Sequence, residues 1–433
     1  MSVTIQADEV PLLFQPGMHV YIQGSSSEPI SILQALKNNP ETSDGIHYIS
    51  NVVPGLNKFD FASLHKNATM TAFFMTRELK KSFLNEKVHF VPLHLTETYN
   101  YLENETKADI AIIQVSPPDK WGYCSLGISA DFVPAVLNKA KIIIAEMNDH
   151  MPSTFGVAPI HIKQLDYIVE TNHPLTEMPK AKFSDEVVQI GKYVSSLIED
   201  GDTIQFGIGS VPESILSCLN DKRDLGIHSG LINDTVVDLV EAGVVTGKKK
   251  TLNSGKIITG IAVGTKRLYD FVNNNPLVEF RPVNYTHSIN VLKQIDHFVS
   301  INSAVEIDLF GQINAETIKG TQFGGTGGQV DFIRGTKLSL NSKSIIALLS
   351  TANNGAISRI VPVLENGTIV TTTRTDVQFV VTENGIADLR NKSLQERADL
   401  LISIAAPQFR KQLENEWGAI KAKWREGLVE QAT

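Results

Sequence analysis

The sequence predicts an α/β protein made of two similarly organised halves. Runs of Val, Ile and Ala recur in the first half, for example at 108–115 and 140–146. Because these runs are apolar on both faces, they fit buried parallel strands. Segments with helical spacing separate them, as at 28–36, which follows the Gly-Ser stretch 24–27. Strands that alternate with helices indicate a sheet covered by helices.

A polar stretch at 171–182, which contains Pro174 and Pro179, predicts the linker between the halves. An amphipathic helix is expected after it at 185–198, followed by a strand at 203–206. The second half therefore begins like the first. HVYIQGSSSEPI and DTIQFGIGSVPESI share the layout of a strand, a glycine loop and a helix that starts near a proline. We expect one domain over 1–180 and a second over 184–433.

Composition and charge narrow the class of protein. The chain has 433 residues and a net charge of −8, which makes nucleic acid or an anionic membrane an unsuitable main partner. Its two cysteines are too few for a disulfide framework. The first ten residues lack the basic and apolar regions of a signal peptide, and no apolar run is long enough to span a membrane. We expect a soluble cytoplasmic protein and, by default, a homodimer or higher homo-oligomer.

Two glycine-rich loops are candidates for ligand binding. In the first, Gly207 and Gly209 turn the chain from the strand into a helix expected at Pro212, whose free N–H groups would attract an anion. A tight structural turn explains that pattern equally well. The second loop has four glycines in five positions from Gly324 to Gly328. Such a density favours close approach to a ligand or N–H groups directed at an oxyanion, although a flexible surface loop is the alternative.

Other chemical motifs are weaker. A strand through Glu306 and Asp308 would place both carboxylates on one face, although a half-exposed polar face explains the same alternation. Cys124 has no neighbouring base and is expected to be structural. The eleven histidines show no spacing typical of metal ligands, so no metal site is predicted.

Taken in order, several blocks resemble the acetyl-CoA hydrolase/transferase family, and especially its 4-hydroxybutyrate and butyrate CoA-transferase-like members of class I. The resemblance spans most of the chain, and its blocks are SPPDKWGYCSLGIS (116–129), QFGIGSVPESIL (205–216), DTVVDLVEAGVVTGKKKTLNSGK (234–256), NSAVEIDLFGQINAE (302–316), GGTGGQVDFIRG (324–335), SRIVP (358–362) and TENGIADLR (382–390).

This resemblance implies two open CoA-transferase domains with the active site between them. It also implies that acyl-CoA and a small carboxylate are the substrates, with coenzyme A as substrate and product rather than as a bound cofactor. In the family a glutamate carboxylate attacks the thioester to give an anhydride and then a glutamyl-CoA thioester. The residues that it implies for oxyanion stabilisation and CoA binding are Gly207, Gly209, Gly325, Gly327, Gly328 and Gln329. It implies Asn302 and Arg359 for substrate binding, although Arg359, like Arg334, fits a surface ion pair equally well.

The sequence departs from the family pattern at the nucleophile. The family has a glutamate two residues after a histidine, whereas His228 is followed by Ser229 and Gly230. Glycine cannot form an acyl anhydride, so the usual route is not carried over. Transfer by another carboxylate or by a ternary complex, hydrolysis with His228 or a carboxylate as the base, and binding of acyl-CoA without chemistry all stay open. The carboxylates to examine are Asp234, Glu306 and Glu97.

A dinucleotide-dependent oxidoreductase is the alternative from another class. It would require the loop at Gly207 to open a dinucleotide crossover, yet the third glycine of that fingerprint is absent. We therefore expect an acyl-CoA-utilising enzyme, with CoA transfer as the first activity and hydrolysis as the second.

Overall fold

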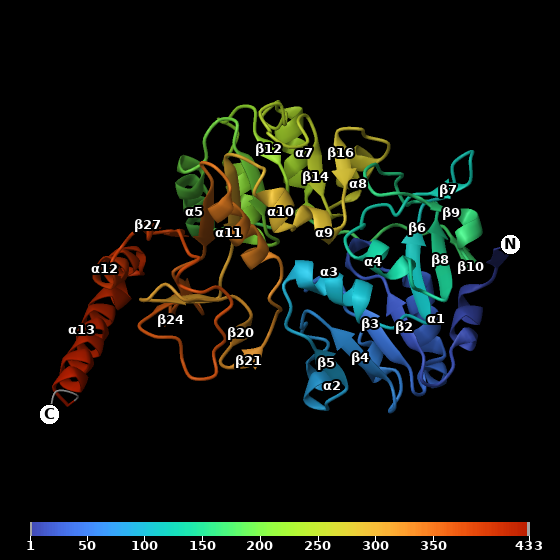
Figure 1. Ribbon diagram of the computed structural model, residues 1–433, viewed down its shortest axis with the longest axis horizontal. Helices are drawn as coiled ribbons and strands as arrows, with labels where there is room; N and C mark the ends of the chain where they lie inside the picture. Colours follow the sequence, from blue (N-terminus) through green and yellow to red (C-terminus); the bar gives the residue numbers. More distant parts are fainter. Residues whose placement is uncertain (1, 431–433) are drawn as a thin grey trace.

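The computed structural model describes residues 2–430, and in it the two halves lie side by side along the long axis of the molecule (Figure 1). Each half contains one large sheet. The first sheet has eight strands, all paired in parallel, in the order β1 (Val3–Thr4), β10 (Tyr167–Thr171), β8 (Ile142–Asn148), β6 (Ile110–Val115), β2 (His19–Ile22), β3 (His47–Ser50), β4 (Thr69–Ala72) and β5 (Val88–Phe90).

The second sheet has six strands and is parallel except for its last pair. Their order is β12 (Gly226–Ile227), β11 (Thr203–Phe206), β17 (Phe298–Asn302), β22 (Lys343–Ala347), β26 (Phe379–Thr382) and β27 (Gly385–Asp388). The orders β10-β8-β6-β2-β3 and β26-β22-β17-β11-β12 match strand for strand. The predicted α/β class and the similar layout of the halves are therefore confirmed.

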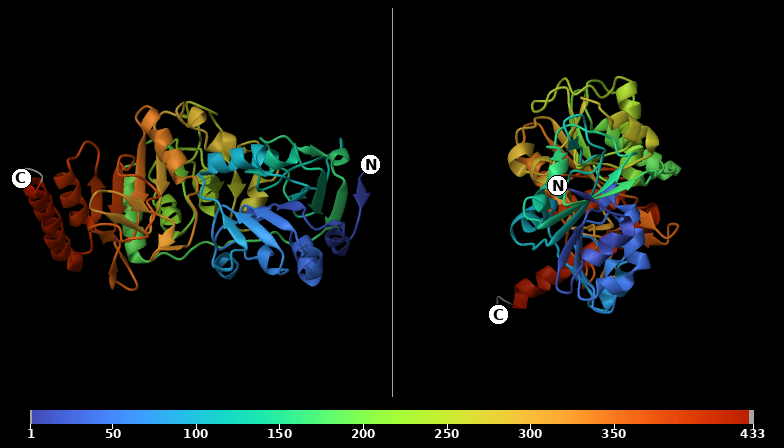
Figure 2. Two further views of the ribbon diagram at one scale, coloured as in Figure 1. Left: turned by 60° about the horizontal axis from the view of Figure 1, so that its bottom comes forward. Right: turned by 90° about the vertical axis from the view of Figure 1, so that its right-hand side faces the viewer.

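Helices cover the sheets and connect their strands. In the first half these are α1 (Ile30–Asn38), α2 (Lys80–Leu84), α3 (Leu95–Asn104) and α4 (Val133–Leu137). In the second half they are α5 (Asp185–Ser196), α6 (Ser210–Ser217), α7 (Asp234–Glu241), α8 (Lys266–Val272), α9 (Val283–Thr286), α10 (Ile289–Leu292), α11 (Gln329–Leu338), α12 (Leu394–Ile404) and α13 (Pro407–Glu430). Helix α13 lies at the end of the molecule opposite the amino terminus (Figure 2).

Short two- and three-stranded sheets complete the structure. They pair β7 (Tyr123–Cys124) with β9 (Ile160–His161), β13 (Leu231–Ile232) with β15 (Ile261–Ala262), β14 (Ile257–Thr259) with β16 (Val278–Phe280), β20 (Thr317–Ile318) with β21 (Thr321–Gln322), β23 (Thr351–Ala352) with β24 (Ile357–Ser358), and β18 (Glu306–Asp308) with β19 (Ile313–Asn314) and β25 (Ile360–Val361).

The apolar core is shared between the halves. Every residue of β6 is buried, which is why its sequence has no polar-apolar alternation. One contiguous cluster of buried side chains includes Val115 and Met147 of the first sheet together with Ile204 and Val299 of the second. Because apolar burial stabilises at about 25 cal/mol per Å², this shared core favours a fixed relative position of the two sheets and of any site between them.

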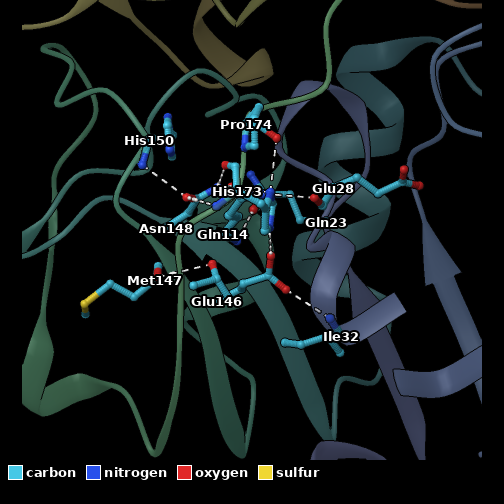
Figure 3. Close-up of polar contacts among 11 residues, drawn as sticks. Gln23, Glu28, Ile32, Gln114, Glu146, Met147, Asn148, His150, His173 and Pro174 are labelled. Atoms are coloured by element: carbon cyan, nitrogen blue, oxygen red, sulfur yellow. Dashed lines mark hydrogen bonds and ion pairs between the residues drawn. The ribbon is translucent and has the colours of Figure 1, made fainter. Parts of the chain in front are cut away.

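In the first half, the carboxyl ends of the central strands are closed by a polar network (Figure 3). The Glu146 carboxylate is fully buried; it accepts the Ile32 N–H at the start of α1 and lies 2.7 Å from His173 Nε2. The Asn148 amide donates to Gln114 and to the His173 carbonyl, both at 3.0 Å. Since His173 lies in the segment between the halves, this network ties the start of the linker to the first sheet.

Candidate active site

A cavity of about 200 Å³ lies between the two halves. From the first half it is lined by the segment after β3, which includes Asn51, and by Asp131 before α4. From the second half come the turn after β11, the end of β17 and the start of α11. Several lining residues follow the carboxyl ends of parallel strands, which is where open α/β sheets bind ligands.

The turn after β11 has the predicted layout, with a helix that begins earlier than expected. Gly209, at φ +120°, is the N-cap of α6, so the helix starts at Ser210 rather than at Pro212. Gly207 lines the cavity, whereas Gly209 lines an adjoining cavity of about 240 Å³ together with Asp234. Ile208 lines both cavities. The two therefore lie next to each other across this turn.

The second glycine-rich loop is pressed against the other half of the molecule. A Cβ at Gly325 would overlap the Phe73 carbonyl oxygen, and one at Gly327 would lie 3.2 Å from the Phe74 ring. Gly327 also has a φ of +63° and accepts the Leu95 N–H at 3.3 Å. Gly328 and Gln329 line the cavity at the start of α11. Close packing of the two halves thus accounts for much of the glycine density.

Gly230 lines the cavity, and its side-chain position is already occupied. A Cβ built at Gly230 would lie 2.8 Å from Cε1 and 3.1 Å from Nε2 of His287. A Cβ at Gly328 would overlap the same imidazole from the other side. His287 follows α9, lines the cavity and is only 3% exposed. Burial lowers the pKa of His287 to about 3, so the ring is neutral at physiological pH.

His228 is not among the residues that line the cavity. Its Nε2–H donates to the Thr286 carbonyl at 3.0 Å, and its Nδ1 is buried with no hydrogen-bond partner in the described part of the chain. Burial lowers the pKa of His228 to about 3. The placement gives His228 no direct access to a substrate in the cavity.

The carboxylates singled out from the sequence also lie away from the cavity lining. Asp234, in the first turn of α7, accepts the N–H and the hydroxyl of Thr265 at 2.8 and 2.5 Å. Glu306 accepts the Asn314 amide at 2.9 Å across the small β18–β19 sheet. Glu97 accepts the His94 N–H at 3.3 Å at the start of α3. Each carboxylate has a local structural partner instead.

Asp131 is the one carboxylate among the described residues that line the cavity, and no local sequence pattern marks it as a site residue. Its Oδ1 accepts the Phe132 N–H at 2.9 Å and the Ser129 hydroxyl at 3.1 Å. Burial raises the pKa of Asp131 to about 6. A carboxyl group that titrates near neutrality suits acid-base work.

Amide side chains supply most of the other polar groups in the cavity. Asn302 and Gln205 are hydrogen-bonded to each other at 3.2 Å, and Gln329 donates to Thr372 at 2.9 Å. Asn51 is 8% exposed, and its Nδ2 has no hydrogen-bond partner among residues 2–430. None of the described residues that line the cavity is Lys or Arg. Arg359, like Arg334, lies outside the lining, so the structure does not place it beside a ligand there.

The described residues contain neither a metal-binding cluster nor a membrane-spanning helix. Within residues 2–430 no group of three or more His, Cys, Asp or Glu side chains is arranged to hold a metal ion. No helix in this range is long and apolar enough to cross a membrane. Cys124 is buried, and burial raises the pKa of its thiol to about 11, which fits a structural role.

Comparison with known proteins identifies the family. Residues 3–179 match the acetyl-CoA hydrolase/transferase N-terminal domain, and residues 264–417 match the corresponding C-terminal domain. The chain belongs to the acetyl-CoA hydrolase/transferase family. It is 44% identical to the 4-hydroxybutyrate coenzyme A transferase of Clostridium kluyveri over 90% of this chain and 91% of that protein. It is 39% identical to the butyryl-CoA:acetate CoA-transferase of Anaerostipes caccae over 78% of each.

The fold agrees with this membership. The crystal structure of RipA from Yersinia pestis matches with a TM-score of 0.91 and 32% identity, and the match covers 97% of this chain and 98% of that one. The chain is therefore an enzyme of the CoA-transferase and acyl-CoA hydrolase kind. His228, and not an acidic residue, follows β12, which counts against a dinucleotide at the Gly207 loop.

Proposed function

We propose that this protein transfers coenzyme A from an acyl-CoA to a small carboxylate, with the acyl thioester end and the carboxylate bound in the cavity at once. The observation that carries the proposal is the pairing of Gly230 with His287. Position 230 offers no carboxylate, and His287 occupies the space that such a side chain would need. On the family resemblance, Gly230 stands where the nucleophilic glutamate would be, so in this proposal the acceptor itself attacks the thioester.

The chemistry balances without a covalent enzyme intermediate. The acceptor carboxylate oxygen bonds to the thioester carbon, and the carbon–sulfur bond breaks to give a mixed anhydride and CoA thiolate. The thiolate then attacks the acceptor carbonyl of the anhydride. This step releases the original acyl group as its carboxylate and leaves the acceptor as a new thioester. Holding both reactants in one cavity provides the proximity that this route needs.

The cavity suits small substrates. Its volume of about 200 Å³ is below the roughly 300–1,000 Å³ of pockets that hold drug-sized ligands. Asn51 lines the cavity, and its side-chain amide is the group that we expect to bind an oxygen of the acceptor. Acetate, butyrate and 4-hydroxybutyrate are the acceptors to test first, because the relatives named above act on such acids.

Hydrolysis is the second candidate, and Asp131 is the observation that favours it. Its carboxyl group lines the cavity and titrates at about pKa 6, so it could accept a proton from water. Water would then replace the acceptor in the attack on the thioester. An acyl-CoA-binding protein without catalysis is the remaining reading.

One chromatographic assay separates the three. The protein is incubated with butyryl-CoA and isotopically labelled acetate, and labelled acetyl-CoA and free CoA are quantified together. Labelled acetyl-CoA without matching free CoA supports transfer. Free CoA alone replaces transfer by hydrolysis. If neither product appears with any acceptor while butyryl-CoA still binds, the protein is a binder and the proposal fails.

The assay does not test the domain limits, the oligomeric state or the location of the enzyme. The domain limits at 180 and 184, the homo-oligomeric state and the cytoplasmic location remain predictions from the sequence.

A further inference from the structure

His287 lies between two glycines, and a side chain at either position would overlap its ring. Its imidazole lies against the missing Cβ positions of Gly230 and Gly328. The backbone itself does not require glycine at either position. Gly328 has a φ of −93°, and the φ of Gly230 lies outside the left-handed region. Both positions therefore exclude a side chain because of the ring and not because of the main chain.

The hydrogen bonds around His287 indicate which ring nitrogen carries the proton. Nδ1 lies 2.8 Å from the hydroxyl of Thr286, which is fully buried. If Nδ1 were the donor, the Thr286 hydroxyl would have to donate its own proton elsewhere. The acceptor within reach is the Pro282 carbonyl, which is 3.5 Å away and at the limit of a hydrogen bond. The hydroxyl therefore donates to Nδ1. In the neutral ring this places the proton on Nε2.

Nε2 is left as a donor at the edge of the cavity. It makes no hydrogen bond within residues 2–430, and the ring lines the cavity beside Gly328. Nε2 is not among the buried unpartnered atoms of the described chain, which fits a nitrogen that faces the open space of the cavity. The backbone N–H of Gly328 opens α11 and likewise has no acceptor in the described chain. His287 and Gly328 therefore line the same cavity as Gly230 and each offers an N–H group without a protein acceptor.

We propose that His287 Nε2–H donates a hydrogen bond to the thioester carbonyl oxygen of the bound acyl-CoA and stabilises the oxyanion that forms there. This inference rests on the proposed function and deepens it. As the acceptor attacks the carbonyl carbon, the π electrons move onto oxygen, and the developing charge is held by Nε2–H. The imidazole keeps its proton throughout, so the step requires no acid and leaves no altered residue.

Burial of the ring supports this role. The pKa of His287 is about 3, so the ring does not become a cation near neutral pH. A neutral imidazole polarises a carbonyl without transferring its proton. The Phe332 ring, tilted by 45° against the imidazole with its centroid 4.3 Å away, packs on the ring and helps to keep it in place.

Three variants test the assignment. His287→Met fills the space without a hydrogen-bond donor, and His287→Gln keeps an N–H near the Nε2 position. Thr286→Val removes the hydroxyl that bonds to Nδ1. Removing one oxyanion donor typically lowers kcat by about 10²–10³-fold. We expect that loss for His287→Met, with KM changed less than about threefold and at least tenfold recovery in His287→Gln. Equal losses in Met and Gln, or a kcat for Met close to wild type, would overturn the proposal.

A measurement on the unmodified enzyme protects against variants that do not fold. Nitrogen-15 NMR of the histidine rings distinguishes the two neutral tautomers. We expect a ring with protonated Nε2 whose signal shifts on addition of a non-reactive analogue of butyryl-CoA that keeps the carbonyl but has a methylene group between it and the sulfur. A ring with protonated Nδ1, or one unaffected by the analogue, would overturn the assignment. Absence of transfer and hydrolysis in wild type would instead contradict the proposed function, so the two failures are distinguishable.

Discussion

Alanine at position 230 should be tolerated only when His287 is removed. In the wild-type background, the new methyl group would lie 2.8 and 3.1 Å from two ring atoms that are fixed by Thr286 and Phe332. Overpacking of this kind typically costs about 1–3 kcal/mol. The more restricted unfolded chain returns about 0.4–1 kcal/mol, since the φ at 230 does not require glycine. We therefore expect Gly230→Ala to destabilise wild type by up to about 2.5 kcal/mol.

In the His287→Ala background the clash is gone and only the gain remains. Gly230→Ala should then stabilise the protein by about 0.4–1 kcal/mol relative to His287→Ala alone. The coupling between the two positions is the difference, about 1–3 kcal/mol, which is typical of residues in contact. A value near zero would mean that the ring does not fill the side-chain position of residue 230.

Urea unfolding of the four proteins, followed by circular dichroism and by tryptophan fluorescence, measures this coupling. Gly418→Ala is the matched control, because Gly418 lies on α13 with nothing within 4 Å of its missing Cβ. It should stabilise both backgrounds by the same amount, about 1 kcal/mol. The reasoning is refuted if Gly230→Ala changes the free energy of unfolding equally with and without His287.

Three further outcomes are expected. Asp131→Asn should keep the transfer rate within about tenfold of wild type while lowering any hydrolysis rate by about 10²–10⁴-fold. Labelled acetyl-CoA measures transfer and free CoA measures hydrolysis. Loss of transfer would instead make Asp131 the nucleophile. Asn51→Ala should raise KM for the acceptor about fivefold to tenfold, as one hydrogen bond predicts, with KM for acyl-CoA unchanged in initial-rate assays. The hydrogen bond that His173 Nε2–H donates to Glu146 raises the pKa of His173. The stabilisation from this pair is therefore complete below the unfolded pKa of about 6.5. It is lost as pH rises through the higher folded pKa, and the stability gap between wild type and His173→Ala should shrink from pH 6 to pH 9.

Much of the fold could be predicted from local patterns. The buried run that became β6 and the amphipathic helix α5 were expected near their observed limits, and β11 has the predicted bounds. Element starts were less accurate, because capping depends on backbone conformation. Helix α6 begins two residues early since Gly209 takes the N-cap, and Pro29 precedes α1 as its N-cap. Strand β4, Thr69–Ala72, has no counterpart in the sequence-based expectations because four residues are too few to show a periodic pattern.

The site was predicted only where it lies in continuous motifs. Gly207, Gly230, Asn302, Gly328 and Gln329 do meet at one cavity. The remaining lining residues come together through packing between segments that are distant in sequence. His287 is 57 positions after Gly230, and no local spacing marks it as a partner of that glycine. Asn51 and Asp131 belong to the other half of the chain, so only the assembled fold brings them to the cavity.

The alternation in Glu306 and Asp308 shows how a pattern can be correct about structure without indicating function. The segment does form a strand, β18. Asp308, however, accepts the N–H groups of Phe310 and Gln312 at 3.1 and 2.8 Å, which stabilises the turn to β19. Its carboxylate has a structural role that the sequence alone could not distinguish from acid-base chemistry.

The most direct test of the central claim asks whether the enzyme becomes covalently modified. Initial rates are measured over a grid of butyryl-CoA and acetate concentrations, and the enzyme is examined by intact mass after incubation with butyryl-CoA alone. The account predicts an intersecting, sequential rate pattern and an unmodified protein that hydroxylamine does not inactivate. Parallel lines, together with a CoA adduct on Asp131 or another carboxylate, would contradict it.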